Sequence, residues 1–136
     1  MRGGKFIDTN IWVYAHLRSP NEPRHPIALD FVSTLDNAVI SPQVMMEYYN
    51  VMLRSGRNDA WIQENLHEVL GYVQLQPLNE AVVHRTWAIR NRYHFSIWDS
   101  QIIAAALEAG CDSLYTEDLQ HGQIVETLKV MDPLQR

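Results

Sequence analysis

The sequence predicts an α/β fold with a mostly parallel central sheet, and three observations support that class. Short apolar runs of strand length, such as KFI at 5–7 and AVI at 38–40, alternate with longer segments of helical period. The intervening segments are long enough for the crossover helices that parallel strand pairs require. The chain has 136 residues, of which 46% are hydrophobic and 20% charged, as in ordinary globular proteins. We therefore expect one domain over residues 1–136.

The first part of the chain contains two of the expected strands. The strand at 5–7 is followed by a helix over 9–17. The segment RSPNEPRHP at 18–26 contains three prolines and predicts a loop, and a helix over 27–35 follows it. The apolar run NAVIS at 37–41 predicts the second strand.

The middle of the chain carries helix start and stop signals. The Ser-Pro pair at 41–42 is typical of an N-cap and a first helical position, and this helix should end near Leu53. RSGRND predicts a turn, after which a helix over 60–70 should stop at Gly71. The segment YVQLQPL at 72–78 predicts a third strand.

The last part of the chain predicts two helices and two strands. An asparagine cap precedes a helix over 80–92, and a second helix lies within 96–110, between a serine start and a glycine stop. SLYT at 113–116 and LKVM at 128–131 are the remaining expected strands. The pattern contains no repeat and no linker.

Four acidic residues follow these strands or open the helices beside them. Asp8 directly follows the first strand, and Glu47 lies in the second turn of the helix after the second strand. Asp118 follows SLYT, and Asp99 opens the long apolar helix. Ligands of parallel α/β sheets bind outside the carboxyl ends of the strands. We therefore expect the four carboxylates to meet at one end of the sheet.

Each acid also has a purely structural interpretation. Asp8 is a good N-cap, as is Asp118 or Thr116 before it. Asp99 fits a capping box with Ser96, although its spacing from the apolar residues that follow puts it on the core side of its helix.

Glu47 belongs to a polar stripe along one face of its helix. Gln43, Asn50 and Arg54 share that face. The stripe is equally compatible with a solvated surface and with the lining of a cleft.

Composition limits the chemistry of a clustered site. Four carboxylates within a few ångströms repel one another unless a cation compensates them. Oxygen ligands select hard ions, so Mg²⁺ or Mn²⁺ is expected. The sequence has no Cys-x-x-Cys and no His-Glu-x-x-His, and its only cysteine, Cys111, favours a reducing cytoplasm. No apolar run approaches the ~20 residues that span a membrane.

Four stretches, taken in order, resemble PIN-domain nucleases. They are FIDTN, SPQVMMEYYNV, WDSQIIAAALEAGC and LYTEDLQHG, and their order and spacing are most similar to short VapC-type ribonuclease toxins of toxin–antitoxin pairs. The resemblance covers essentially the whole chain and implies an α/β/α sandwich with a mostly parallel sheet. It also implies an acidic pocket that holds one or two Mg²⁺ or Mn²⁺ ions and cleaves single-stranded or loop RNA.

The resemblance assigns roles to individual residues. It implies that the four acids of the pocket, which serve as both catalytic residues and metal ligands, are Asp8, Glu47, Asp99 and Asp118. Asn10 and Thr116 match the small polar positions beside the first and fourth acids. TEDLQHG departs from the Thr-x-Asp-x-Asp-Phe form common in the family, so Glu117 or His121 are alternatives to Asp118 for part of its role.

The implied partners are RNA, a cognate antitoxin and a second copy of the chain. An antitoxin is expected to cover the pocket, with a basic side chain among the acids, and apolar residues such as Trp12 are candidate anchors. Hydrolysis by an activated water leaves a 5′-phosphate and a 3′-hydroxyl and does not use the 2′-hydroxyl, so a preference for RNA must come from shape or contacts.

The net charge of −5 does not by itself favour a nucleic-acid binder. Candidate phosphate contacts are four arginines near the acids or among aromatic residues: Arg54, Arg57, Arg90 and Arg92. The competing interpretation of HRTWAIRNRYHFSIW is a solvated helix end whose aromatic residues lie in the core.

Two rival functions remain open at this point. A phosphatase with an aspartyl nucleophile also begins with an acid at a strand end, but it usually has a second acid two residues later, where this chain has Asn10. The other rival is a catalytically silent PIN-like domain that acts as a binding scaffold.

Overall fold

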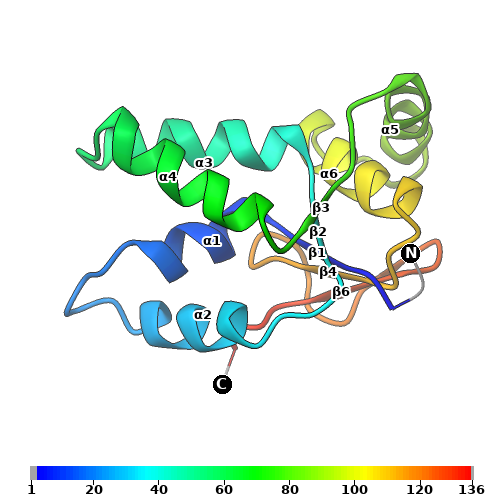
Figure 1. The fold of residues 1–136 in the computed structure, drawn as a ribbon. Helices are drawn as coiled ribbons and strands as arrows, with labels where there is room; N and C mark the ends of the chain where they lie inside the picture. The colour runs from blue at the N-terminus through cyan, green and yellow to red at the C-terminus, as the bar shows by residue number, and fades with distance from the viewer. Residues whose placement is uncertain (1–2, 136) are drawn as a thin grey trace.

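The computed structural model describes residues 3–135 and shows a sheet with helices on both faces (Figure 1). Within residues 3–135, six strands form the sheet: β1 Lys5–Ile7, β2 Ala38–Ile40, β3 Gln74–Leu75, β4 Ser113–Tyr115, β5 Ile124–Val125 and β6 Leu128–Met131. The same part of the chain forms six helices around the sheet: α1 Thr9–His16, α2 Arg24–Ser33, α3 Pro42–Arg54, α4 Asp59–Leu70, α5 Glu80–Tyr93 and α6 Ile97–Glu108. The predicted α/β sandwich is therefore confirmed.

The strand order is β3-β2-β1-β4-β6-β5; among the described strands, the β5–β6 pair is antiparallel and the other pairs are parallel. β1 lies between β2 and β4, and its last residue, Ile7, pairs with Tyr115 of β4. The chain therefore leaves β1 and β4 side by side at the same edge of the sheet. This brings the segment after Ile7 next to the segment after Tyr115, as the sequence predicts.

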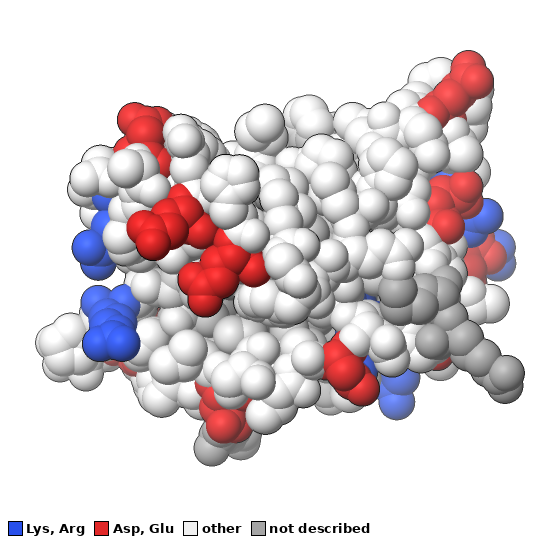
Figure 2. All heavy atoms as spheres, in the orientation of Figure 1, with Lys and Arg blue, Asp and Glu red and all other residues white. Residues whose placement is uncertain are grey.

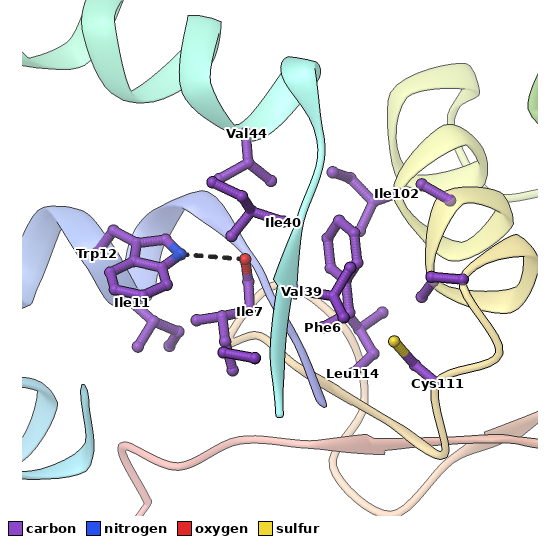
Figure 3. Packing of buried hydrophobic residues seen from close by; sticks show 14 of the residues in the cluster. Phe6, Ile7, Ile11, Trp12, Val39, Ile40, Val44, Ile102, Cys111 and Leu114 are labelled. Atoms are coloured by element: carbon purple, nitrogen blue, oxygen red, sulfur yellow. Dashed lines mark hydrogen bonds between the residues drawn. The ribbon is translucent and has the colours of Figure 1, made fainter. Parts of the chain in front are cut away.

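The core occupies both faces of the central strands because their side chains alternate between the two faces. Phe6 and Val39 face the α5 and α6 side, whereas Ile7 and Ile40 face the α1 side (Figure 3). α1 to α4 lie on this second side of the sheet in Figure 1.

Trp12 lies in this second half of the core, with only 2% of its surface exposed, and its indole N–H donates to the carbonyl of Ile7 at 3.2 Å (Figure 3). The expectation that Trp12 anchors an antitoxin is therefore wrong. Its position on an apolar helix face reflects core packing.

Three elements differ from the prediction by more than one residue at an end. α2 begins at Arg24 instead of residue 27, because Pro26 lies in the first turn, where the missing N–H needs no helical acceptor. β3 is short because its partner β2 has only three residues to pair with. β5 was not expected, because its turn to β6 contains Glu126 at φ 56° in place of the usual glycine or asparagine.

α5 and α6 begin where their capping signals indicate, whereas Ser41 precedes α3 without a side-chain capping hydrogen bond. Asn79 accepts from the N–H of Val82 at 3.0 Å, and Ser96 accepts from the N–H of Asp99 at 3.0 Å. Across residues 3–135, none of the helices is both long enough and apolar enough to cross a membrane.

Candidate active site

A pocket of about 500 Å³ opens where the chain leaves β1 and β4. It is bounded by α1, α3 and the start of α6. Its acidic lining residues are Asp8, Glu47, Asp99 and Asp118. Other residues of its wall include Thr9, Asn10, Tyr14, Gln43, Asn50 and Arg54. The structure thus brings all four acids singled out in the sequence to one cavity, although they are separated by up to about a hundred residues of chain.

Asp8 is both the N-cap of α1 and part of the pocket wall. One carboxylate oxygen accepts from the backbone N–H of Thr9 at 2.7 Å, and the other accepts from the hydroxyl of Thr116 at 2.8 Å. The side chain is almost fully buried, at 6% exposure. The structural and functional interpretations of this residue are therefore compatible.

Burial raises the pKa of Asp8 from its ordinary value of 3.8 to about 7. The hydrogen bonds from Thr116 and Thr9 oppose this rise, and the nearby charges of Asp118 and Glu47 add to it. In the absence of a compensating cation, Asp8 therefore carries a proton for much of the time near neutral pH. A carboxylate held in this state favours a positive charge beside it.

Glu47 is oriented by two neighbours. The hydroxyl of Thr9 donates to one of its oxygens at 2.7 Å, and the side-chain amide of Gln43 donates to the other at 3.3 Å. Gln43, Glu47, Asn50 and Arg54 all line the pocket. The polar stripe on α3 is therefore the wall of a cleft.

Asp118 and Asp99 complete the acidic wall. The backbone N–H of Asp118 donates to the hydroxyl of Thr116 at 3.0 Å, so this one buried threonine contacts both Asp8 and the Asp118 backbone. Partial burial raises the pKa of Asp118, and the charges of Asp99 and Glu117 raise it further. The first and fourth acids are thus linked through Thr116.

The environment suits a hard cation, although the ligands do not yet converge. Within residues 3–135, no three carboxylate, imidazole or thiol groups are arranged to hold a metal ion in this conformation. Both polar atoms of the Asn10 amide are buried without a hydrogen bond of normal geometry, although the amide lies close enough to Asp118 to lower its pKa. The Asn10 amide and the carboxylates that line the pocket with it are oxygen donors, and this is the ligand chemistry that Mg²⁺ or Mn²⁺ prefers.

The two alternatives to Asp118 lie outside the pocket wall. Glu117 accepts from the hydroxyl of Tyr14 at 2.8 Å and contacts Arg24 at 3.5 Å, which joins its loop to α1 and α2. His121 is exposed and accepts from the backbone N–H of Asp132 at 2.9 Å. Glu117 therefore holds its loop against α1 and α2, whereas Asp118 lines the cavity.

Among the four arginines singled out in the sequence, Arg54 alone lines the pocket. Arg57 stacks on Trp61, Arg90 donates to the carbonyl of Phe95, and Arg92 pairs with Glu126. On the face shown in Figure 2, lysine and arginine side chains are few and separated. Phosphate binding at the cavity therefore depends on few basic groups of the chain itself.

The profile of the PIN domain family matches residues 5–126. The chain belongs to the PIN domain family. That match includes β1 to β5 and all four acids of the pocket. Among curated proteins, none gives a significant match to this chain.

Solved structures of a toxin and of toxin–antitoxin complexes have a similar fold. The toxin VapC20 of Mycobacterium tuberculosis, described as cleaving the Sarcin-Ricin loop, is 16% identical, with a TM-score of 0.69 over 85% of this chain and 92% of the other. VapBC2 of Rickettsia felis, solved with a DNA fragment from its promoter, is 17% identical, with a TM-score of 0.69 over 94% and 97%. A toxin–antitoxin complex of Klebsiella pneumoniae is 19% identical, with a TM-score of 0.68 over 96% and 98%. At these identities the similarity establishes the shared fold.

Several residues that shape the pocket were not singled out by the sequence. Thr9 positions Glu47, and Tyr14 is part of the wall and holds Glu117. The position of Thr9 directly after Asp8 could have marked it as a pocket residue, because the side chains of an N-cap and of the next residue lie close together. Nothing local marks Tyr14, because its partner lies 103 residues away in the chain.

Proposed function

We propose that this PIN domain is a metal-dependent endoribonuclease and the toxin of a toxin–antitoxin pair, acting in the cytoplasm. The observation that carries the proposal is the single cavity lined by Asp8, Glu47, Asp99 and Asp118 at the carboxyl ends of β1 and β4. Membership of the PIN family supports the same conclusion. A silent scaffold would have no need for a buried carboxylate that destabilises the folded state near neutral pH.

The pocket residues have distinct tasks in this proposal. Asp8, Glu47, Asp99 and Asp118 would hold Mg²⁺ or Mn²⁺, with the Asn10 amide beside them. When bound, such an ion supplies an activated water and neutralises charge on the phosphoryl oxygens. Thr9, Gln43 and Thr116 keep the carboxylates of Glu47 and Asp8 in position. Arg54 at the cavity wall is the candidate contact for the substrate phosphate.

The purified chain should cut single-stranded RNA in Mg²⁺ or Mn²⁺ and stop in EDTA, because in the proposed mechanism the bound ion supplies the activated water and EDTA removes that ion. The measurement is cleavage of total RNA, with the new ends tested for a 5′-phosphate. Unchanged cleavage in EDTA by the parent, combined with loss of that cleavage in an Asp118→Asn variant, would assign the reaction to this chain without metal and refute the metal-dependent mechanism.

An antitoxin is the proposed partner. Similar folds are found in toxin–antitoxin complexes from Klebsiella pneumoniae and in VapBC2 of Rickettsia felis. The acidic cavity suits a basic side chain from the partner, and a homodimer is also proposed. Expression of the chain alone should stop growth, and the small gene beside it should restore growth when co-expressed. Normal growth with the chain expressed in soluble form would remove the toxin assignment.

A further inference from the structure

A second cavity, of about 460 Å³, adjoins the acidic pocket. We call this cavity the Trp98 shelf. Its apolar surface is formed by Met46, Leu78 and Trp98. These side chains are unusually exposed for their type, at 71%, 50% and 63%. The expectation that the aromatic residues of HRTWAIRNRYHFSIW all lie in the core is therefore wrong for Trp98, and also for Trp87, which is 54% exposed.

The shelf and the acidic pocket have a common wall. Gln43, Glu47 and Asn50 line both cavities. A ligand that lies on Trp98 is therefore next to the residues that also line the space bounded by the four acids.

A fixed amide links the two cavities. The side-chain N–H₂ group of Gln43 donates to the carbonyl of Trp98 at 3.2 Å and to the carboxylate of Glu47 at 3.3 Å. Gln101 in turn donates to the Gln43 side-chain oxygen at 2.6 Å. This network sets the position of the first turn of α6 relative to Glu47, and it lines the shelf with hydrogen-bonding groups that are already oriented.

From this arrangement we propose that the Trp98 shelf binds a nucleobase of the RNA next to the phosphate that is cleaved. The inference rests on the proposed nuclease function and names the contact that positions the substrate. A flat apolar aromatic surface with amide groups at its edge matches a base, which has a stacking face and a polar rim. The shelf carries no lysine or arginine, which suits the uncharged base rather than the phosphate.

Base stacking would also explain how a chain with few basic groups near the pocket binds RNA. The chain has a net charge of −5, and Arg54 is the one basic side chain that lines the acidic pocket among the residues that the structure describes. The chain's own basic side chains therefore supply little of the affinity for RNA. Contacts with unpaired bases supply affinity without positive charge, and unpaired bases are available only in single strands and loops.

A second copy of the chain is the competing occupant, because exposed apolar side chains also occur at interfaces between subunits. The concave form of the shelf and the wall that it shares with the acidic pocket favour a small ligand continuous with the substrate. The two occupants predict different effects of the same variant, so they can be separated by experiment.

The test compares RNA binding by the full chain and three variants. Trp98→Ala removes the stacking surface, and Trp98→Phe keeps a ring. Trp87→Ala is the matched control, because Trp87 is similarly exposed, at 54%, but lies on α5 outside both cavities. The probe is a short unstructured RNA with phosphorothioate linkages, which slow hydrolysis, and the readout is fluorescence anisotropy in Mn²⁺ and in EDTA. Sedimentation of each protein in the same buffers reports the oligomeric state.

Trp98→Ala should weaken binding roughly 5- to 150-fold, the range that loss of one base stack produces. Trp98→Phe should bind within a few-fold of the parent, and Trp87→Ala should not differ from it. Equal binding by Trp98→Ala and the parent, or no RNA binding by the parent in either buffer, would overturn the proposal. So would a loss of binding accompanied by conversion of a dimer to a monomer, since that result identifies the shelf as an interface between copies.

These outcomes are separable from the fate of the proposed nuclease activity. If the chain cuts RNA and Trp98→Ala binds normally, the shelf proposal fails and the function stands. If the chain binds RNA through Trp98 but never cuts it, the shelf stands and the nuclease proposal fails.

Discussion

Replacing Asp8 with asparagine should abolish RNA cleavage and, at the same time, stabilise the metal-free protein at neutral pH. Cleavage should fall by more than the ~100-fold that loss of an outer-shell partner of a metal costs. Asparagine keeps the cap, because its side-chain oxygen can still accept from the N–H of Thr9. It also removes a buried charge that no cation balances in EDTA. The variant should therefore keep the fold.

The direction of the pH effect follows from the raised pKa of Asp8. The pKa of Asp8 is about 7 in the folded protein, against an ordinary value of 3.8. Between pH 3.8 and about 7, the folded state therefore binds a proton at Asp8 that the unfolded state has lost. The stability contributed by Asp8 is therefore complete below about pH 4 and is lost as the pH rises through about 7. This difference between the two pKa values corresponds to a loss of stability on the order of 4 kcal/mol, since each tenfold change in proton affinity is worth ~1.4 kcal/mol. The asparagine variant should not show this loss.

Addition of Mn²⁺ should remove or reverse the difference in stability between the parent and the Asp8→Asn variant. At about 1,000 times its dissociation constant, a bound ion stabilises the folded state by ~4 kcal/mol, and the parent alone should gain this fully. The measurement is thermal melting in EDTA and in Mn²⁺, with Asp30→Asn as a control because Asp30 is exposed on α2, away from the pocket. An equal difference in both buffers, together with normal cleavage, would show that Asp8 is only a cap.

The second large effect concerns Thr116, which is fully buried between the first and fourth acids. Thr116→Val keeps the side-chain shape but removes the hydroxyl that donates to Asp8 and accepts from the backbone of Asp118. It should destabilise the protein by about 2–3 kcal/mol, because a buried carboxylate loses a charge-assisted hydrogen bond. Since this hydrogen bond lowers the pKa of Asp8, the pKa should rise further in the variant.

Thr86→Val provides the matched control for this prediction. Thr86 is also buried, at 3% exposure, but its hydroxyl donates to the helix carbonyl of Val82. Its replacement by valine should therefore cost clearly less. Thr116→Ser should recover most of the loss. Denaturant unfolding of the three variants and the parent measures these differences, and equal losses for Thr116→Val and Thr86→Val would show that the link between the two acids has no special role.

The parts of the fold that the sequence predicts well are those set by local chemistry. The strands at 5–7 and 38–40 follow from short apolar runs, and the caps Asn79 and Ser96 mark helix starts correctly. β5 was missed because it has two residues and its turn contains Glu126 in place of a residue that favours positive φ. The start of α2 differs from the prediction because the three prolines at 18–26 favour a loop, although the first turn of a helix accepts proline.

Some features of the candidate site could likewise be predicted from the sequence, and others could not. The four acids could be predicted to share a cavity, because parallel topology brings the carboxyl ends of β1 and β4 together. The contacts that orient them depend on side chains from distant segments. Thr9 and Glu47 are 38 residues apart, and no local sequence pattern predicts a hydrogen bond between them. The exposure of Trp98 and the burial of Trp12 likewise depend on which face of each helix meets the sheet.

A calorimetric titration of the purified chain with Mn²⁺ tests the central claim, that the four carboxylates form a metal site, most directly. The parent should bind the ion with release of protons near pH 7, because metal binding displaces the proton that the buried Asp8 holds. The Asp8→Asn variant, folded by circular dichroism, should bind at least ~10-fold more weakly. Absence of binding by the folded parent, or equal binding by the parent and the variant, would contradict the metal site and favour a PIN domain that serves as a scaffold.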